Sequence, residues 1–430
     1  MSDITVGFAG MTHLGIVSSA AVASKNFKVI CFDEDTSLIS RLRDRKLPIV
    51  EPDLDDLVRV NGVRQVFTDD ITDLQDCDVV YIAPDVPTDD EGKSNLDGIR
   101  ALINRVVLAL NKNAILVVLC QVPPGFTREL KGWPADQLYY QVETLVFGRA
   151  VERATKPERY IIGCNDPQKP LPLAFQSVLT AFDCPLLPMR YESAELAKIS
   201  INCCLVASVS VANTLAELCE KIGADWSEIA PALKLDRRIG AFSYLSPGLG
   251  IAGGNLERDL ATVLRFADHH GADAGVVSAW VANSRYRRNW AIKTIMSELL
   301  NAHEDSKLCI WGLAYKENTH SIKNSPSLAT ISQLPNKTKL QVTDPIVPGT
   351  VVDRALVTYF DKHEQALSGA DALLILTPWP QYRNFDPIKI KAQLNGKLVL
   401  DPYAVLDERA CVSAGLDYLT LGKPPVRALV

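Results

Sequence analysis

Features that mark several other protein classes are missing from this sequence. No apolar run approaches the roughly 18 residues of a membrane span, so no such span is expected. The first residues, Met1–Val6, enter a strand pattern at once and lack a basic segment, which argues against a signal peptide. Basic residues are not in excess, since the formal net charge is −6. A nucleic-acid partner is therefore not expected, because such proteins usually carry a basic patch.

Cysteine and histidine patterns that hold metals or disulfides are also missing. The ten cysteines are scattered, often within apolar runs, and none forms a CxxC pair. The adjacent Cys203 and Cys204 lie in a helical pattern, which favours packing over a metal site. The six histidines show no ligand spacing with cysteines or carboxylates. We therefore expect reduced thiols, a cytoplasmic protein and no metal site.

The composition that remains is that of an ordinary globular protein. With 430 residues, 47% of them hydrophobic and 22% charged, the chain is expected to form two or three domains. In its first third, short β-branched runs alternate with helical stretches, which is typical of buried parallel strands in a doubly wound domain. The expected strands cover residues 4–9, 28–32, 79–83, 114–119 and 160–163.

The middle of the chain has a helical pattern. From Glu192 to Ile222 there is no glycine or proline, which predicts one long helix that Gly223 ends. Helical spacing continues from Leu260 to Leu300, and a strand pattern then returns at residues 307–312, 339–343, 372–376 and 397–400. We predict an α/β fold with two Rossmann-like doubly wound domains joined by a long helix and a helical central domain. The expected domains are residues 1–190, 191–300 and 301–430.

The first expected strand runs into a dinucleotide-binding turn, Gly10-Met11-Thr12-His13-Leu14-Gly15. The tight turn needs the first glycine, and close packing of the helix against the strand needs the last. Thr12 takes the place of the middle glycine, so it either shifts the phosphates or hydrogen-bonds them. Asp33 ends the second strand about 20 residues further on, where a carboxylate binds the ribose hydroxyls of NAD and repels the 2′-phosphate of NADP. The cofactor is therefore expected to be NAD.

A second glycine-rich segment is Gly250-Ile251-Ala252-Gly253-Gly254-Asn255-Leu256-Glu257-Arg258-Asp259. It resembles the catalytic loop of the UDP-glucose/GDP-mannose dehydrogenase family, in which glycines lead into a nucleophilic cysteine and, four residues later, an aspartate. Asp259 matches the aspartate, but Asn255 stands at the cysteine position. A carboxamide cannot form the thioester that the family's second oxidation requires.

The resemblance extends over nearly the whole chain. Leu47–Pro52, Val86-Pro87-Thr88 and Val122–Gly125 match loops of the family's cofactor domain, although Cys120-Gln121 replaces the Ser-Thr pair before the last of them. Glu143 matches a glutamate of the Asn-Pro-Glu-Phe-Leu motif, whose next glutamate has become Phe147.

The long helix and the last domain also match the family. On the helix, Lys198 and Asn202 reproduce the family's Lys and Asn pair, and their i, i+4 spacing puts both on one face. In the last domain, Gly312–Lys316 resembles the family's Gly-Leu-Ala-Phe-Lys loop, with Lys323 in place of an arginine. His320, Ser321 and Tyr403 replace other usual residues, which implies that the sugar differs from glucose.

The resemblance implies a role for each matched residue. The catalytic residues are Lys198, Asn202, Asp259, Glu143 and the substituted Asn255. The cofactor contacts are Gly10, Thr12, His13, Leu14, Gly15, Asp33, Val86, Pro87, Thr88, Gln121, Arg258 and Lys323. The substrate contacts are Arg238, Tyr244, Gly250, Gly253, Gly254 and Lys316, with Arg237 as an alternative to Arg238.

Three functions fit these residues. The leading one is a two-electron, NAD-dependent oxidation of a UDP-sugar hydroxyl, or an epimerase-like cycle on the same site, because the thioester-forming cysteine is absent. The second is a four-electron 6-dehydrogenase that makes a uronic acid through an aldehyde hydrate. The third is a non-catalytic paralogue that binds a nucleotide sugar. For any of them, the apolar surface of the helix from Glu192 predicts a homodimer, and the pathway expected is polysaccharide or glycoconjugate synthesis.

Overall fold

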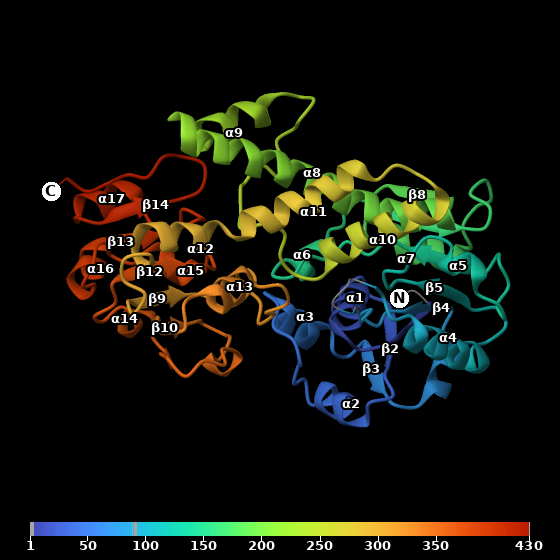
Figure 1. Ribbon diagram of the computed structural model, residues 1–430. Helices are drawn as coiled ribbons and strands as arrows, with labels where there is room; N and C mark the ends of the chain where they lie inside the picture. Colours follow the sequence, from blue (N-terminus) through green and yellow to red (C-terminus); the bar gives the residue numbers. More distant parts are fainter. Residues whose placement is uncertain (1–3, 88, 90–92, 430) are drawn as a thin grey trace. The chain divides into compact units, whose positions relative to one another are not determined.

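The computed structural model describes residues 4–87, 89 and 93–429, and the chain divides into two compact units, residues 1–201 and 202–430. Each unit contains one sheet with helices packed against it, and the helix α8 (Tyr191–Ile222) runs from the first unit into the second (Figure 1). The predicted α/β fold with two Rossmann-like parts and helical regions is confirmed. The boundaries predicted at residues 190 and 300 stay a prediction.

The first unit is built on an eight-stranded sheet in the order β3-β2-β1-β4-β5-β6-β7-β8. All neighbouring strands pair in parallel except β6 and β7, which are antiparallel. The strands are β1 (Thr5–Ala9), β2 (Lys28–Phe32), β3 (Gln65–Thr68), β4 (Val79–Ile82), β5 (Ile115–Val118), β6 (Leu138–Gln141), β7 (Tyr160–Cys164) and β8 (Leu186–Arg190). Every residue of β4 and β5 is buried, as expected for central strands covered on both faces.

Eight helices accompany this sheet within the described residues. They are α1 (His13–Ser24), α2 (Thr36–Arg43), α3 (Leu54–Asn61), η1 (Ile71–Asp76), α4 (Asp97–Ala109), α5 (Phe126–Glu129), α6 (Ala150–Thr155) and α7 (Leu173–Thr180). The helix α1 is made of small and apolar residues, and nine of its twelve residues are buried. It therefore packs closely on the sheet directly after the dinucleotide turn.

The five strands predicted in this unit are confirmed, but β3, β6 and β8 were not predicted. The strand β8 is the edge of the sheet, has no buried residue and contains Pro188. A proline is tolerated at an edge, where its missing N–H costs no ladder hydrogen bond. Such a strand has no apolar pattern to read from the sequence.

The predicted long helix is confirmed as α8, which has 32 residues and is followed by Gly223 with φ of +82°. Its length and mean hydropathy, 1.6 over the most apolar 18 residues, would allow it to cross a membrane, although 39% of that stretch is buried within the protein. Long core helices of soluble proteins have the same properties, so α8 alone is weak evidence for a membrane span.

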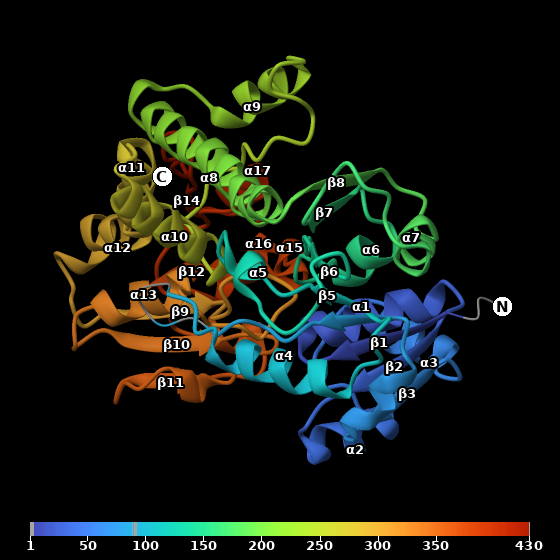
Figure 2. The same ribbon diagram turned by 90° about the vertical axis from the view of Figure 1, so that its right-hand side faces the viewer.

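The second unit contains a six-stranded parallel sheet in the order β11-β10-β9-β12-β13-β14, in which β9, β10 and β11 lie side by side in Figure 2. The strands are β9 (Lys307–Trp311), β10 (Lys339–Thr343), β11 (Val357–Tyr359), β12 (Ala372–Ile375), β13 (Leu398–Leu400) and β14 (Asp417–Leu419). Four of the six were predicted. The short β11 and β14, three residues each at the two edges, were not.

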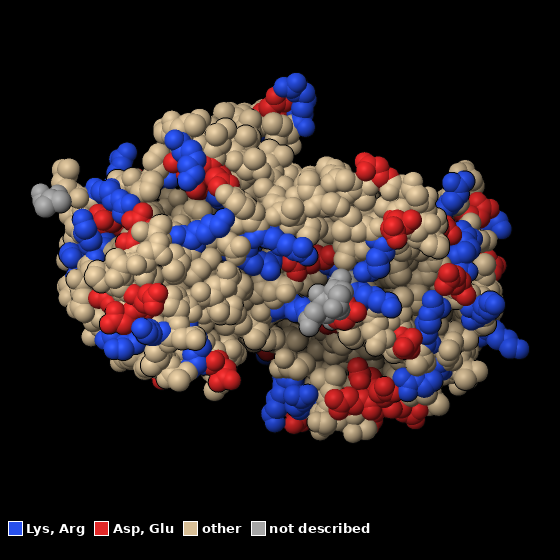
Figure 3. Space-filling model, in the orientation of Figure 1, with Lys and Arg blue, Asp and Glu red and all other residues tan. Residues whose placement is uncertain are grey.

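The helices of the second unit lie before and between these strands. Besides α8, the described residues form α9 (Trp226–Leu235), α10 (Asn255–His270), α11 (Gly275–Arg288), α12 (Trp290–Ile295), η2 (Met296–Leu300), α13 (Pro326–Gln333), η3 (Gly349–Val351), α14 (His363–Ala366), α15 (Pro380–Arg383), α16 (Pro387–Gln393) and α17 (Glu408–Ser413). Acidic and basic side chains are interspersed over the face of the protein in Figure 3, in keeping with the small net charge.

Candidate cofactor and active-site residues

The turn between β1 and α1 has a backbone that only glycine can adopt. Gly10 has φ of +99°, and a Cβ there would lie 2.8 Å from the backbone nitrogen of Pro84. A Cβ on Gly15 would lie 1.9 Å from the carbonyl oxygen of Gly10. Both glycines are therefore required by close backbone contacts, and the turn leads directly into the N-terminal end of α1, the end of a helix that attracts anions.

A cavity of about 270 Å³ lies next to this turn and is lined by Gly10, Asp33, Glu34, Asp85 and Pro87, among others. The carboxylate of Asp33 accepts hydrogen bonds from the backbone N–H of Met11 at 2.7 Å and of Asp35 at 3.0 Å. Each oxygen keeps lone-pair capacity for a ribose hydroxyl. The glycine turn, the helix end and this carboxylate together fit a dinucleotide such as NAD.

Thr12 links the turn to the loop that follows β4. Its hydroxyl accepts a hydrogen bond from the backbone N–H of Asp85 at 2.8 Å and lies 3.4 Å from the carbonyl oxygen of Ala83 as a donor. These two contacts connect the turn to the loop that follows β4. No sequence pattern indicates a role for Asp85, because its position beside Thr12 arises from the pairing of β1 with β4.

His13, the first residue of α1, pairs with a buried carboxylate. Its Nε2 lies 2.8 Å from Oε1 of Glu51, whose side chain is fully buried and also accepts hydrogen bonds from the backbone N–H groups of Gly148 and Ala150. Burial alone would raise the pKa of Glu51, but these hydrogen bonds hold it below its ordinary value. The ring of Phe147 packs on His13 with the centroids 4.3 Å apart.

Lys198 and Glu143 form an ion pair within the first unit. Lys198 Nζ donates to Oε2 of Glu143 at 3.3 Å, and the two side chains are only 11% and 16% exposed. The other oxygen of Glu143 accepts a short hydrogen bond from the backbone N–H of Leu145. The carboxylate is thus held in place by two donors on different segments of the chain.

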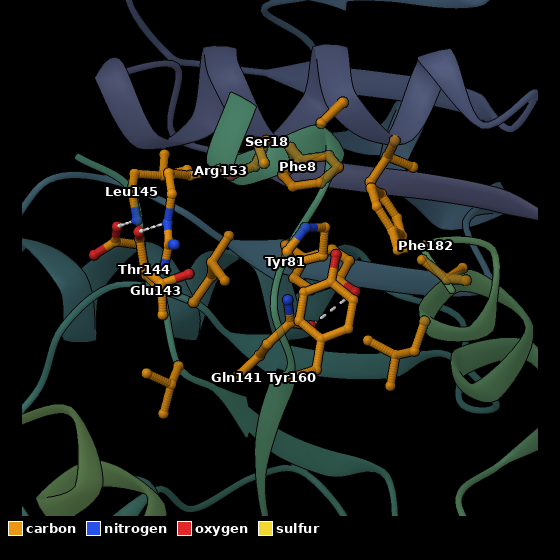
Figure 4. Close-up of a pocket in the computed structure, with 18 residues that line it drawn as sticks. Phe8, Ser18, Tyr81, Gln141, Glu143, Thr144, Leu145, Arg153, Tyr160 and Phe182 are labelled. Carbon is orange, nitrogen blue, oxygen red and sulfur yellow. Dashed lines mark hydrogen bonds between the residues drawn. The ribbon is translucent and has the colours of Figure 1, made fainter. Parts of the chain in front are cut away.

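Glu143 also borders a small cavity of about 50 Å³ beneath α1. In Figure 4, Glu143, Leu145 and Arg153 lie at one end of this cavity, and the rings of Phe8, Tyr81, Tyr160 and Phe182 line the rest. The hydroxyl of Tyr81 donates to the side chain of Gln141 at 3.2 Å. The cavity holds room for little more than water, so it is not the place of a nucleotide.

In the second unit, Asn202 and Asp259 are brought together. The amide of Asn202 donates to the carboxylate of Asp259 at 2.5 Å, and both residues are buried, with 8% and 1% exposed. Nε of Arg258 lies 3.5 Å from the other oxygen of Asp259. An amide and a guanidinium therefore hold this carboxylate in place.

The glycine-rich loop also needs its glycines for close contacts. Gly250 has φ of +72°, and a Cβ there would lie 2.4 Å from the carbonyl oxygen of Ser284. A Cβ on Gly253, with φ of +79°, would lie 3.1 Å from the ring of Tyr315. The N–H of Gly253 donates to the carbonyl oxygen of Lys323 at 3.1 Å. The loop is thereby fixed against the segment predicted to hold nucleotide.

Asn255 begins α10 and is exposed, directly after Gly254 at the N-cap position. Its side chain therefore stands at the positive end of a helix, which is a suitable place for a group that faces a polar ligand. The structure brings Asn255 and Asp259 onto the same helix one turn apart.

The remaining residues that the sequence predicts for the site make separate contacts. Nζ of Lys316 lies over the Tyr315 ring at 5.6 Å. The guanidinium of Arg238 pairs with Asp236 in the same loop, with Nε 3.0 Å from Oδ1, and Tyr244 is 52% exposed. Leu14 is buried, and Val86 and Gln121 are half-buried, while Thr88 lies outside the described residues.

The chain matches three domains of one protein family along its length. These are the UDP-glucose/GDP-mannose dehydrogenase family NAD binding domain over residues 4–179, the central domain over residues 192–285 and the UDP binding domain over residues 309–408. The UDP-glucose 6-dehydrogenase TuaD of Bacillus subtilis is 28% identical over 98% of this chain and 94% of its own length. The UDP-glucose 6-dehydrogenase of Pseudomonas aeruginosa is 27% identical, with 96% of each chain covered.

Solved structures agree with these matches. A UDP-glucose dehydrogenase from Pyrobaculum islandicum superposes with a TM-score of 0.83 at 25% identity, covering 95% of this chain and 98% of the other. A UDP-D-ManNAc dehydrogenase from Pyrococcus horikoshii shares the fold with a TM-score of 0.84 at 21% identity, covering 98% and 100%. The chain belongs to the UDP-glucose/GDP-mannose dehydrogenase family and is an NAD-dependent nucleotide-sugar dehydrogenase.

Proposed function

We propose that this enzyme oxidises a hydroxyl of a UDP-sugar by two electrons and stops at an aldehyde or ketone. The observation that carries the proposal is Asn255 at the start of α10, where the resemblance implies a nucleophilic cysteine. Without a thiol at this position, no thiohemiacetal forms and the second hydride transfer lacks its usual substrate. NAD supplies the hydride acceptor when it is bound beside the β1–α1 turn.

The residues for a first oxidation are all present. Lys198 stabilises the alkoxide that develops as the sugar hydroxyl loses its proton, and its burial strengthens this electrostatic effect. Asp259, directly or through water, takes the hydroxyl proton. Asn202 orients Asp259 through the hydrogen bond at 2.5 Å and leaves its own carbonyl oxygen for the substrate.

The residues for hydrolysis of a thioester are altered together. Gln121 and Phe147 stand where the resemblance implies a threonine and a glutamate. Phe147 packs on the ring of His13, so an apolar contact occupies a place where the family carries charge. Changes confined to one half of a reaction support a shortened reaction better than a loss of all activity.

We further propose that the sugar is not glucose and that the product enters polysaccharide or glycoconjugate synthesis in the cytoplasm. The changed positions His320, Ser321, Lys323 and Tyr403 all belong to the UDP binding domain or its border. The ten cysteines are free thiols, seven of them buried, which suits a reducing compartment.

Counting NADH released per UDP-sugar consumed tests the proposal. One NADH per sugar, with an aldehyde or ketone as product, is expected. Two NADH with a uronic acid would show the four-electron reaction instead. No turnover over a broad panel of nucleotide sugars, together with tight sugar-nucleotide binding, would favour the non-catalytic paralogue.

A further inference from the structure

The loop after β4 places a carboxylate beside the dinucleotide turn. The backbone N–H of Asp85 donates to the hydroxyl of Thr12 at 2.8 Å, which fixes residue 85 next to the N-terminal end of α1. Asp85 also lines the cofactor cavity together with Asp33 and Glu34. None of the roles assigned above uses Asp85.

The three carboxylates of this cavity are not equally neutralised. Glu34 forms an ion pair with Arg105, and Asp33 accepts two backbone hydrogen bonds. No ion pair within the described part of the chain includes Asp85.

The groups that bear on the Asp85 carboxyl come from several segments. Desolvation within the cavity raises its pKa and Glu143 adds to this, while His13 and the Thr12 hydroxyl act in the opposite direction. Burial raises the pKa of the Cys120 thiol, and the charge of Asp85 raises it further. The Asp85 carboxyl thus has neighbours that favour its charged form and neighbours that oppose it, and no lysine or arginine of the described residues forms an ion pair with it.

The N-terminal end of a Rossmann helix is where the diphosphate of a dinucleotide binds, because free N–H groups and the helix dipole attract negative charge. The backbone N–H of His13, at the start of α1, hydrogen-bonds to the Asp85 carboxyl, and a carboxylate held there repels a second anion. We propose that Asp85 limits the affinity of the enzyme for NAD, because its carboxylate competes with the cofactor's diphosphate for the start of α1. Asp33 then selects the kind of cofactor, whereas Asp85 sets how tightly it is held.

Weaker binding of the cofactor has a direct consequence for turnover. NADH must leave before the next NAD binds, and product release limits the rate of many enzymes. The inference does not depend on which sugar is oxidised or on how many electrons are removed.

The test is a calorimetric titration of NAD into the sugar-free enzyme, in wild type and three variants. Asp85→Asn is expected to bind NAD roughly tenfold more tightly, because one charge repulsion at short range is removed. Asp85→Glu keeps the charge and is expected to bind no more tightly than wild type. Asp76→Asn is the matched control, because it removes the same charge from an exposed position on η1 outside the cavity.

Ionic strength provides a second readout that a purely structural role would not change. The advantage of Asp85→Asn over wild type is expected to shrink as salt is raised, because screening weakens the repulsion that the substitution removes. The proposal is overturned if Asp85→Asn binds NAD as wild type does, or more weakly, while its thermal unfolding is unchanged. It is also overturned if Asp76→Asn gives the same gain. Since the titration contains no sugar, failure of the proposed two-electron reaction would leave this result unaffected.

Discussion

At the scale of single residues, Lys198 is the side chain on which the proposed chemistry depends most. It is a buried cation whose partner within hydrogen-bond distance is the carboxylate of Glu143. A buried charge of this kind acts strongly on a developing alkoxide, because little water screens it.

Lys198→Ala is expected to lower kcat by roughly 100-fold or more, since the charge that faces the alkoxide is removed. Steady-state rates of NADH formation provide the measurement. Lys221→Ala, at the exposed end of the same helix, is the control and is expected to behave as wild type. An unchanged kcat for Lys198→Ala would contradict the assigned role.

Asn255 decides between a shortened and a complete oxidation. Asn255→Ala is expected to retain the first oxidation, because no covalent bond depends on the carboxamide. Asn255→Cys is expected to yield some acid product if Glu143 and the aldehyde adopt the family's geometry. Mass spectrometry of the sugar products separates these outcomes, and acid from the wild type would show that the proposed reaction is wrong.

Asp33 is expected to make the enzyme prefer NAD over NADP, because its carboxylate would repel the 2′-phosphate. Paired binding titrations of the two cofactors measure this preference. Equal or tighter binding of NADP by the wild type would remove the role assigned to Asp33.

At the scale of elements, Glu51 joins three segments of the first unit. It precedes α3, pairs with His13 at the start of α1 and accepts backbone hydrogen bonds from Gly148 and Ala150 at the start of α6. Because its pKa is lowered from 4.5 in the folded state, its charged form stabilises the fold fully above that value. The contribution is lost as the pH falls through the lower pKa of the folded protein.

Glu51→Ala is therefore expected to reduce the free energy of unfolding by about 3 kcal/mol near neutral pH, since it leaves buried donors without an acceptor. The difference from wild type should narrow as the pH falls below the ordinary value of 4.5. Urea unfolding of both proteins at a series of pH values measures this difference in the free energy of unfolding. Glu152→Ala removes a carboxylate from an exposed ion pair and is expected to change stability by less than about 1 kcal/mol. A loss for Glu51→Ala that did not vary with pH would contradict this account.

At the scale of the whole molecule, α8 leaves an apolar stripe uncovered. Val211, Leu215, Leu218 and Ile222 follow one another at helical spacing and are 39% to 65% exposed. A second copy of the chain is the partner that the resemblance implies for this surface, and burial of such a stripe would stabilise a dimer.

The wild type is expected to be a homodimer, and Leu218→Glu to shift it towards monomer, because a charge would be buried at the contact. Light scattering at micromolar concentration measures the molar mass. Leu173→Glu, on α7 and 82% exposed, is the control that should leave the assembly unchanged. A monomeric wild type would contradict the prediction.

Local sequence patterns determined many of the strands, the long helix and the glycine turn of this protein. Buried runs such as Val79–Ile82 and Ile115–Val118 predict central strands because parallel strands covered on both faces must be apolar throughout. The stretch free of glycine and proline predicts α8, and the glycines at 10 and 15 predict the turn. Short edge strands such as β8 and β14 could not be predicted, since half-exposed or three-residue segments carry too little periodicity.

Only the tertiary structure decided which distant side chains meet. Thr12 meets Asp85, 73 positions away, because β1 pairs with β4. Lys198 meets Glu143 because α8 returns to the segment that follows β6. Sequence alone determined that a dinucleotide turn and an asparagine-bearing glycine loop exist, because these depend on local backbone geometry. Which carboxylates line the cofactor cavity depends on the order of the strands in the sheet. That order cannot be read from any local stretch of sequence.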